Sequence, residues 1–350
     1  MRLFWFLLSF LLLSTAACRT IDKQPTEPAL AELPQEETRP GESMIESDTS
    51  ILPAGFDSQG HRGARGLKPE NTLPAFETAL DLGVSTLELD LHFSADQEVV
   101  VWHDPKIDKV KSRLDPDSDV ETRDPDSLVK WGSELMVSQL TLDQLQAYIC
   151  DRNPDVAVYR DQENSPTTIA GDDYRILTLA ELFEFVEDYA ASDLKSEAQR
   201  ENARHVRFNI ETKRKPDNPK FINDGFDGQN PGPFELEILR LIEEYGLGER
   251  VTVQSFDHRS LWAIRSVNED INLSALTYKE VPDFVDIAGQ GATIWSPRYK
   301  DVNPMLIKKA HEAGLLVIPW TVNEASVMLD LIAMGVDGII SDRPDILLDL

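Results

Sequence analysis

Cysteine is almost missing from this chain, which has only Cys18 and Cys150 among its 350 residues. These two leave room for at most one internal disulfide, and for none if Cys18 is modified. Positive charge is also scarce: 34 lysines and arginines face 62 aspartates and glutamates, a formal net charge of −28. That charge argues against DNA, RNA or anionic lipid headgroups as long-range partners. A small anionic substrate would need local cations or a metal ion to approach it.

Long apolar runs are missing as well, except at the N-terminus. Arg2 precedes the apolar residues 3–13, and small residues lead up to Cys18. This is the pattern of a secretory signal peptide, predicted to cover residues 1–17. Its apolar part is too short to span a bilayer as a mature helix.

The end of that segment, Ala16-Ala17-Cys18, resembles a bacterial lipobox, in which the cysteine is lipidated and becomes the new N-terminus. Ordinary cleavage after Ala17 is the alternative. By resemblance to Gram-negative lipoproteins, Arg19 favours the outer membrane, with the protein facing the periplasm; otherwise the protein would be periplasmic or secreted. Residues 18–50 are rich in Pro, Glu, Ser and Thr without an apolar period, which predicts a solvated tether. The membrane would then be a partner only through the lipid anchor.

No glycine-rich dinucleotide fingerprint follows any predicted strand, which disfavours a doubly wound open sheet. From about residue 52, short apolar strands alternate instead with amphipathic helices. Residues 51–350 are therefore predicted to form one (β/α)8 TIM barrel. The predicted strands are Asp57–His61, Ser85–Leu91, Val206–Lys213, Val251–Phe256, Asn272–Thr277, Thr293–Trp295, Leu315–Trp320 and Val336–Ser341. The predicted helices between them are Asn71–Leu82, Pro233–Tyr245, Arg259–Asn268, Asn303–Ala313 and Glu324–Met334.

A long insertion interrupts this rhythm after the second strand. The strand-like run Glu98–His103 follows too closely for a parallel crossover, so it is predicted to be a hairpin partner that returns the chain to the site. Residues 104–205 then form an excursion of charged loops with helices near Thr141–Tyr148 and Thr178–Tyr189. The excursion would cover or narrow the active site, or be a surface elaboration without a catalytic role.

The second strand contains two acids where a buried strand is expected. In "LELDL", Leu87, Leu89 and Leu91 share one face while Glu88 and Asp90 share the other, because side chains alternate along a strand. In a barrel the leucines would pack beneath the helices, and the acids would project inward near the carboxyl-end mouth. Two buried like charges are costly, so a cation is the natural partner.

The third predicted strand also carries charged residues on its inward face, since "RFNIETK" brings Glu211 and Lys213 to the same mouth. Three oxygen ligands without cysteine or paired histidine indicate one hard divalent cation, Ca²⁺ or Mg²⁺, rather than zinc. The alternative is a set of internal salt bridges among Glu88, Asp90, Arg62 and Lys213.

Two histidines end predicted strands, His61 in "GHRG" and His103 in "VVVWHDP". Barrel enzymes keep their chemistry at such strand ends, and histidine exchanges protons near neutral pH. With a metal ion, Arg62 and Lys213, they would make a site for a phosphate ester. One histidine would accept a proton from the attacking hydroxyl and the other would donate one to the leaving oxygen. His92 shares the parity of the two acids but is predicted to lie at the rim.

At these residues the chain resembles the glycerophosphodiester phosphodiesterase family. The motifs "GHRGARGLKPENTLPAF", "LELDLHFSADQEVVVWHDP", "NIETK", "VQSFD", "PWTVN" and "GVDGIISDRPD" follow the family's order over roughly residues 57–348. The resemblance implies a TIM barrel and metal-dependent cleavage of glycerophosphodiesters to glycerol 3-phosphate and an alcohol. It also implies first attack by the glycerol's own hydroxyl, giving a cyclic phosphate that water opens. Direct attack by water would use the same groups.

The resemblance also implies roles for individual residues. Glu88, Asp90 and Glu211 would be the metal ligands, and His61 and His103 the acid–base pair.

Further residues would contact the substrate. Arg62 and Lys213 would bind phosphate. Trp320 would form an apolar wall against the glycerol backbone, or belong to the core. Gln254 would face the site, or make a structural hydrogen bond. Glu70 would support the metal or glycerol site, or hold its loop and cap the following helix.

Two other functions are compatible with the same barrel. A lysophospholipase D would need an apolar channel for an acyl chain, and the excursion shows no obvious apolar stripe. A non-catalytic envelope binding protein would be expected to lack His61, His103 or a metal ligand, and all of these are present.

Overall fold

The computed structural model describes residues 51–127 and 135–350. The predicted signal peptide (1–17), the tether (18–50) and the lipidation site Cys18 lie outside the described residues and stay predictions. Within the described ranges, no helix has the length and apolar character needed to cross a membrane.

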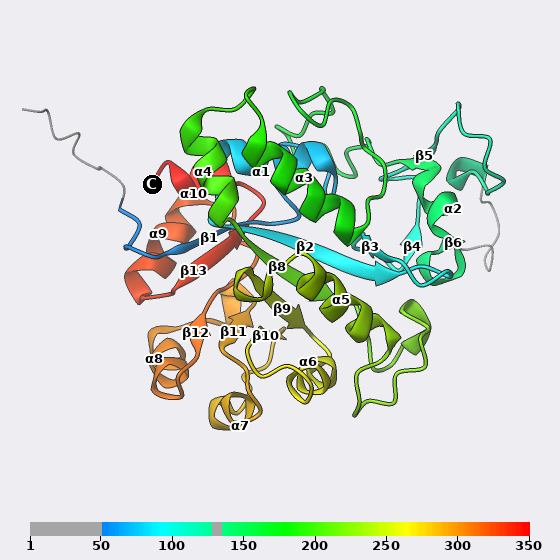
Figure 1. Ribbon diagram of the computed structural model, residues 1–350. Coiled ribbons are helices and arrows are strands. Elements are labelled where there is room, and N and C mark those ends of the chain that lie inside the picture. The colour runs from blue at the N-terminus through cyan, green and yellow to red at the C-terminus, as the bar shows by residue number, and fades with distance from the viewer. Residues whose placement is uncertain (1–50, 128–134) are drawn as a thin grey trace, which may run out of the picture. The chain divides into compact units, whose positions relative to one another are not determined.

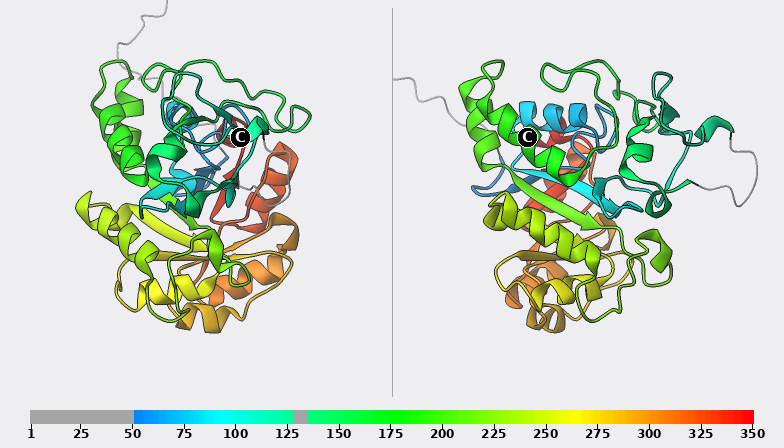
Figure 2. Two further views of the ribbon diagram at one scale, coloured as in Figure 1. Left: turned by 90° about the vertical axis from the view of Figure 1, so that its right-hand side faces the viewer. Right: turned by 45° about the vertical axis from the view of Figure 1, so that its right-hand side comes forward.

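Parallel strands form a barrel with helices around it (Figures 1 and 2), so the TIM-barrel prediction is confirmed. The barrel strands are β1 (Asp57–Gly60), β2 (Thr86–Phe93), β8 (Arg207–Thr212), β9 (Val251–Ser255), β10 (Asn272–Thr277), β11 (Ile294–Pro297), β12 (Leu316–Val317) and β13 (Gly338–Ser341). Their order around the ring is β12-β11-β10-β9-β8-β2-β1-β13. Backbone hydrogen bonds from Ile340 N–H to the Pro319 carbonyl (3.0 Å) and from Asp337 N–H to the Val317 carbonyl (2.9 Å) join the two end strands.

Helices cover the outside of the barrel. They are α1 (Leu73–Leu82), α3 (Leu179–Ala191), α4 (Glu197–His205), α5 (Pro233–Glu244), α6 (His258–Arg265), α7 (Phe284–Gly289), α8 (Pro304–Glu312), α9 (Ala325–Met334) and α10 (Pro344–Leu348). Helix α1 begins two residues later than predicted because the Thr72 side chain caps it by accepting from the Ala75 N–H. The sequence pattern missed α4, which is mostly polar, and α7 and α10, which are short.

The two faces of β2 differ as the alternation predicted. Leu87, Leu89 and Leu91 are fully buried and belong to the main core beneath the helices. Glu88 and Asp90 lie on the opposite face, inside the barrel, and are also buried. Strand β12 is shorter than the predicted Leu315–Trp320, although backbone hydrogen bonds from the Ile318 N–H to the Trp295 carbonyl (3.1 Å) and from the Trp320 N–H to the Pro297 carbonyl (3.0 Å) continue its contact with β11.

The excursion has two parts in the structure. Residues 104–127 and 135–177, called the satellite below, contain the antiparallel pairs β4–β6 and β5–β7 and the helix α2. Tyr148 and Ile176 of the satellite form a small core together with Trp102, which precedes it. The bounds are β4 (Lys106–Ile107), β5 (Arg113–Leu114), β6 (Leu135–Met136), α2 (Leu142–Gln146) and β7 (Tyr148–Ile149). Helices α3 and α4 form the second part and pack against each other and against α1. The predicted hairpin partner is β3 (Val99–Val101), antiparallel to β2.

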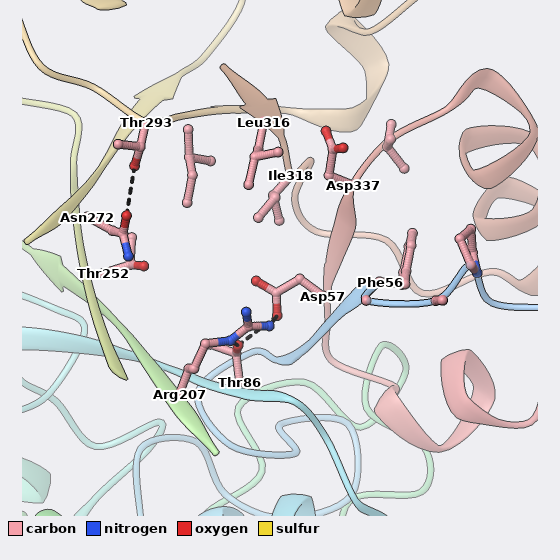
Figure 3. Close-up of a pocket in the computed structure, with 15 residues that line it drawn as sticks. Phe56, Asp57, Thr86, Arg207, Thr252, Asn272, Thr293, Leu316, Ile318 and Asp337 are labelled. Atoms are coloured by element: carbon pink, nitrogen blue, oxygen red, sulfur yellow. Dashed lines mark hydrogen bonds and ion pairs between the residues drawn. The ribbon is translucent and has the colours of Figure 1, made fainter. Parts of the chain in front are cut away.

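A cavity of about 270 Å³ lies at the amino ends of the barrel strands (Figure 3). The Arg207 side chain forms an ion pair with Asp57 there, at 2.9 Å. Chemistry in TIM barrels belongs to the opposite, carboxyl-end face. The buried carboxylates lie toward that face.

Candidate active site

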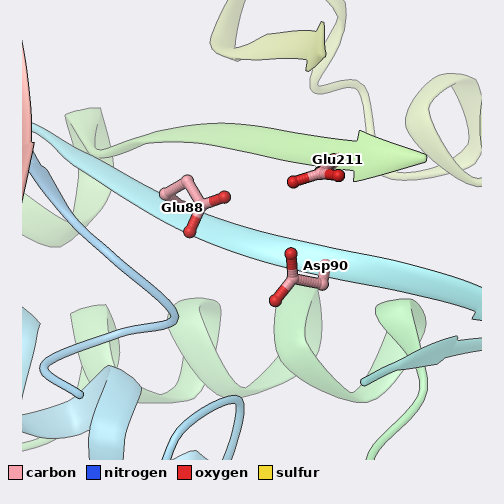
Figure 4. Close-up of side chains that lie close together, drawn as sticks. All are labelled: Glu88, Asp90 and Glu211. Carbon is pink, nitrogen blue, oxygen red and sulfur yellow. The ribbon is translucent and has the colours of Figure 1, made fainter. Parts of the chain in front are cut away.

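Three carboxylates from two neighbouring strands meet inside the barrel (Figure 4). Glu88 and Asp90 come from β2 and Glu211 from β8, and Asp90 is the direct register partner of Glu211. One carboxylate oxygen from each lies within 4.8 Å of the others, and all three residues are buried. Ligands on opposite sides of a calcium ion are about 4.6–5.2 Å apart, so these oxygens can reach a single ion.

The loop after β1 folds tightly against this cluster. Arg62 has a φ of 52°, a left-handed conformation that turns its N–H toward Glu88 Oε2, 3.0 Å away. Gly63 follows with a φ of 84°, and a Cβ there would come within 2.6 Å of the Ala75 backbone. Strained backbone of this kind gathers at functional sites. The sequence "HRG" is thus explained locally: the glycine allows the turn, and the turn aims His61 and Arg62 at the mouth.

Asp90 is held ionised by two cations. Arg62 Nε lies 3.0 Å from its Oδ2, and Lys213 Nζ lies 3.3 Å from its Oδ1. The Asn71 amide also donates to Oδ2 at 2.8 Å. Although burial alone would raise the pKa of Asp90, the charges of Arg62 and Lys213 lower it well below its usual range.

Glu88 has a different environment. Its Oε1 accepts from the Gln254 side-chain amide at 2.7 Å and its Oε2 from the Arg62 backbone. Among the described residues, no lysine or arginine side chain forms an ion pair with it. Burial therefore raises the pKa of Glu88 well above its usual range, and the carboxylate of Asp90 raises it further.

The ion pairs around the cluster do not balance its charge. The contact network joins six carboxylates, from Glu70, Glu88, Asp90, Asp104, Glu211 and Asp342, to four cations, from Arg62, Arg65, Lys111 and Lys213. The excess is two negative charges when both imidazoles are neutral and all six carboxyl groups, Glu88 included, are ionised. A buried excess of that size is what one divalent cation would offset. The predicted salt bridges of Arg62 and Lys213 exist, yet they leave Glu88 unpaired, so the residues present fit a hard divalent ion.

Each of the two histidines is bonded to a carboxylate. His61 Nδ1 lies 2.6 Å from Asp342 Oδ1, and its Nε2 lies 3.8 Å from Glu88 Oε2. His103 Nδ1 lies 2.8 Å from Asp104 Oδ1. Because an ionised carboxylate only accepts hydrogen bonds, Nδ1 is the protonated nitrogen in both rings. Each ring thereby leaves Nε2 as its acceptor.

Both imidazoles are neutral at ordinary pH. Burial lowers the pKa of His61, and the charge of Arg62 lowers it further. Burial also lowers the pKa of His103 to about 3, with Arg62 and Lys213 acting in the same direction. The prediction that His92 lies at the rim is wrong: β2 continues through it, β3 pairs with it, and its side chain is fully buried.

The remaining predicted residues lie around the same mouth. Glu70 contacts Arg62 at 3.0 Å, Arg65 at 2.6 Å and Lys111 at 2.7 Å, so it organises cations rather than capping α1. Gln254 is buried and its amide donates to Glu88.

Trp320 follows β12 at the carboxyl-end face. Its ring packs edge-on against Phe256, with centroids 5.5 Å apart, and stacks near Tyr278 at 6.3 Å. Its Nε1–H donates to the Ser296 carbonyl at 3.0 Å. The side chain is only partly buried.

Sequence reasoning did not assign several residues that complete the site. Asp342 follows β13 directly, and Asp104 is adjacent to His103, so the strand-end rule applied to the two histidines would have found both. Asn323, whose amide donates to Asp342 at 2.8 Å, lies within the quoted motif "PWTVN". Lys111 gave no signal, because the pairing of β5 with β7 determines where its loop lies.

The fold and the site together define a class: a (β/α)8-barrel enzyme whose carboxyl-end mouth combines buried carboxylates, paired imidazoles and cations. Residues 61–346 match the Glycerophosphoryl diester phosphodiesterase family. The chain belongs to that family and is an enzyme of it.

Individual relatives are similar over most of the chain. A glycerophosphodiester phosphodiesterase of Caldanaerobacter subterraneus subsp. tengcongensis is 27% identical over 291 residues, which cover 83% of this chain and 95% of the relative. A crystal structure from Silicibacter pomeroyi DSS-3, assigned as a glycerophosphoryl diester phosphodiesterase, has a TM-score of 0.66 and 26% identity, covering 84% of this chain and 93% of that one. An Oleispira antarctica phosphodiesterase in complex with the product sn-glycerol-3-phosphate has a TM-score of 0.60 over 85% and 96% of the two chains. At 16% identity, that likeness concerns the fold alone.

Proposed function

We propose that this enzyme hydrolyses glycerophosphodiesters to glycerol 3-phosphate and an alcohol, with one bound divalent cation and with His61 and His103 as the proton-transfer pair. The observation that carries the proposal is the meeting of Glu88, Asp90 and Glu211 beside two imidazoles in a barrel of this family. The product named for the Oleispira antarctica phosphodiesterase agrees with this substrate class.

Glu88, Asp90 and Glu211 would hold the cation, and either Ca²⁺ or Mg²⁺ suits three carboxylate oxygens. When bound, the ion would withdraw charge from the phosphoryl oxygens. Lys213 and Arg62 contribute positive charge on the same side of the mouth, each through contact with Asp90. Together they would bind the phosphodiester anion within a strongly acidic protein.

The proton steps follow from the two rings. A hydroxyl oxygen attacks phosphorus and loses its proton to the free Nε2 of one histidine. The bond from phosphorus to the departing oxygen then breaks, and that oxygen takes a proton from the other ring, which must be protonated at Nε2 in that step. The nucleophile would be the glycerol's own hydroxyl, with water opening the resulting cyclic phosphate, or water directly; these side chains serve both routes.

We also propose that Cys18 carries a lipid and anchors the enzyme to the outer membrane, facing the periplasm. The support is the signal-like segment before Cys18. The Cys18→Ser variant should leave the membrane fraction and appear in the soluble periplasmic fraction. Unchanged membrane fractionation would contradict the anchor.

The catalytic proposal is tested by glycerol 3-phosphate release. Purified protein should release it from glycerophosphocholine and other headgroup variants, and a chelator should stop the reaction. His61→Ala and His103→Ala should each abolish turnover while circular dichroism stays unchanged. Turnover of a lysophospholipid in preference to the water-soluble diesters would favour lysophospholipase D activity instead, and wild-type rates in either histidine variant would remove that ring from the mechanism.

A further inference from the structure

Lys111 reaches the active site from the satellite, although it lies outside every barrel element. Its ammonium is 2.7 Å from Glu70 Oε1 and in direct contact with Asp104 Oδ2. It also lies 5.7 Å from the centre of the Trp102 ring. Only 12% of the side chain is exposed.

The satellite holds this lysine from both sides. The loop that carries it is closed by Ser112, whose N–H and hydroxyl both donate to the Asp108 carbonyl, at 3.1 and 2.6 Å. The Lys111 carbonyl accepts from the Arg152 N–H at 3.2 Å. Strand β5 begins two residues later and pairs with β7, and the Arg113 side chain binds Asp151 at 2.8 Å. The ammonium is therefore presented by a built support rather than by an isolated surface loop.

Asp104 lies between this ammonium and the ring of His103. Its Oδ1 binds Nδ1 of the imidazole at 2.8 Å, while its Oδ2 binds Lys111. A carboxylate fixed at both oxygens has one orientation, and it keeps the imidazole proton on Nδ1. In the same way, a buried partner behind a catalytic or metal-bound histidine sets its tautomer and its direction.

A direct contact of Lys111 with the substrate phosphate is less consistent with these contacts. The ammonium is already bound by two carboxylates and is mostly buried. Lys213 and Arg62 hold the positions beside the proposed metal ligands instead.

We infer that the satellite supplies Lys111 as a positioning residue, which fixes Asp104 so that His103 presents an unprotonated Nε2 to the phosphodiester. This inference rests on the proposed function for the role of His103. The sequence left open whether the excursion takes part in catalysis. By this inference it does, because it contributes the buried ammonium of Lys111 behind His103.

The test compares Lys111→Met with Lys111→Arg and with a matched control, Lys109→Met. Lys109 lies on the same loop and its side chain is exposed. Lys111→Met should lower kcat by roughly 10–100-fold while KM changes by less than about threefold, because a positioning contact is lost and no substrate contact is. Lys111→Arg should restore most of kcat, and Lys109→Met should match the wild type.

The second readout is the ¹⁵N shift of the His103 ring nitrogens in ¹⁵N-histidine protein, assigned with His103→Gln. The wild type should show the Nδ1–H tautomer, and Lys111→Met a mixture of both. A change in only one of the two readouts, or a rise in KM with unchanged kcat, overturns the inference. If Lys111→Met does not fold, Lys111→Gln takes its place. The ¹⁵N shifts of the ring can be measured without turnover. If the wild type were inactive, the proposed function would be refuted, and the tautomer of His103 in Lys111→Met would still test whether Lys111 positions Asp104.

Discussion

His61 Nδ1 lies 2.6 Å from Asp342 Oδ1, so the last strand of the barrel holds the ring that follows the first strand. This contact closes the site across the seam where β1 and β13 pair. It also parallels the contact of His103 with Asp104, so both rings carry the proton on Nδ1 and leave Nε2 as the acceptor.

Asp342→Asn should therefore lower kcat strongly, by roughly 10²–10⁴-fold, since an amide no longer selects the Nδ1–H tautomer. KM should change little, because Asp342 is placed behind the ring. Steady-state kinetics on glycerophosphocholine measure both. Asp345→Asn is the matched control, because within the described part of the chain this carboxylate is paired only with Arg343 in the same turn. An Asp342→Asn enzyme with wild-type kcat would show that His61 needs no such partner.

Gln254→Met should weaken metal binding rather than substrate binding. The Gln254 amide donates to Glu88 Oε1 at 2.7 Å, and its loss frees a proposed ligand to turn. Removing such a supporting contact typically costs about 10–100-fold in metal affinity. Activity titrated with Ca²⁺ or Mg²⁺ should show a higher half-saturating concentration and a near-normal kcat at saturation. A raised KM for the diester at saturating metal would instead make Gln254 a substrate contact.

Trp320→Ala should raise KM by about tenfold, which corresponds to ~1.4 kcal/mol of lost apolar contact. The Trp320 ring is partly exposed at the carboxyl-end face, beside Phe256 and Tyr278. Trp320→Phe should recover most of the affinity. Trp262→Ala, on the outer helix α6, makes the same change away from the mouth and should leave KM unaltered. Equal KM values for wild type and Trp320→Ala would place this ring outside the substrate site.

Acid should destabilise the protein partly through His103. Burial holds the pKa of this ring at about 3 in the folded state, below its usual 6.5. Between those values the unfolded chain takes up a proton that the folded chain refuses. The stabilising contribution is thus complete above pH 6.5 and is lost as the pH falls toward 3.

Urea unfolding at pH 7, 5.5 and 4.5 measures this effect. The free energy of unfolding of the wild type should fall by roughly 2 kcal/mol more than that of His103→Gln between pH 7 and 4.5. If the free energy of unfolding changed with pH in the same way for both proteins, the His103 ring in the folded protein would titrate like a free imidazole, which would contradict the prediction.

Strand patterns in the sequence predicted the barrel and the centre of the site. The alternation of Leu87 and Leu89 with Glu88 and Asp90 was enough to predict that the two acids point into the barrel. A strand has only two faces, and the leucine face must meet the core. The apolar run overestimated the length of β12, which covers only Leu316–Val317 although backbone hydrogen bonds to β11 continue to Trp320.

Contacts between distant segments could not be predicted in the same way. Lys111 reaches Asp104 only because short strands of the satellite pair with partners far along the chain. The rim position expected for His92 was wrong although the hairpin partner was predicted, because the strand pattern does not show the register that pairs His92 with Val100. Coordinates were also needed to show that no lysine or arginine side chain among the described residues forms an ion pair with Glu88, since spacing shows which residues share a face and not which of them touch.

The most direct test of the central claim is a count of bound metal made together with turnover. Wild-type protein and Asp90→Asn are stripped with a chelator, dialysed against Ca²⁺ or Mg²⁺, and analysed for metal per chain and for glycerol 3-phosphate release in the same samples. Wild type should bind one ion per chain and regain activity in proportion to it, while Asp90→Asn, folded by circular dichroism, should do neither. Full turnover by stripped wild-type protein without bound metal would contradict the account.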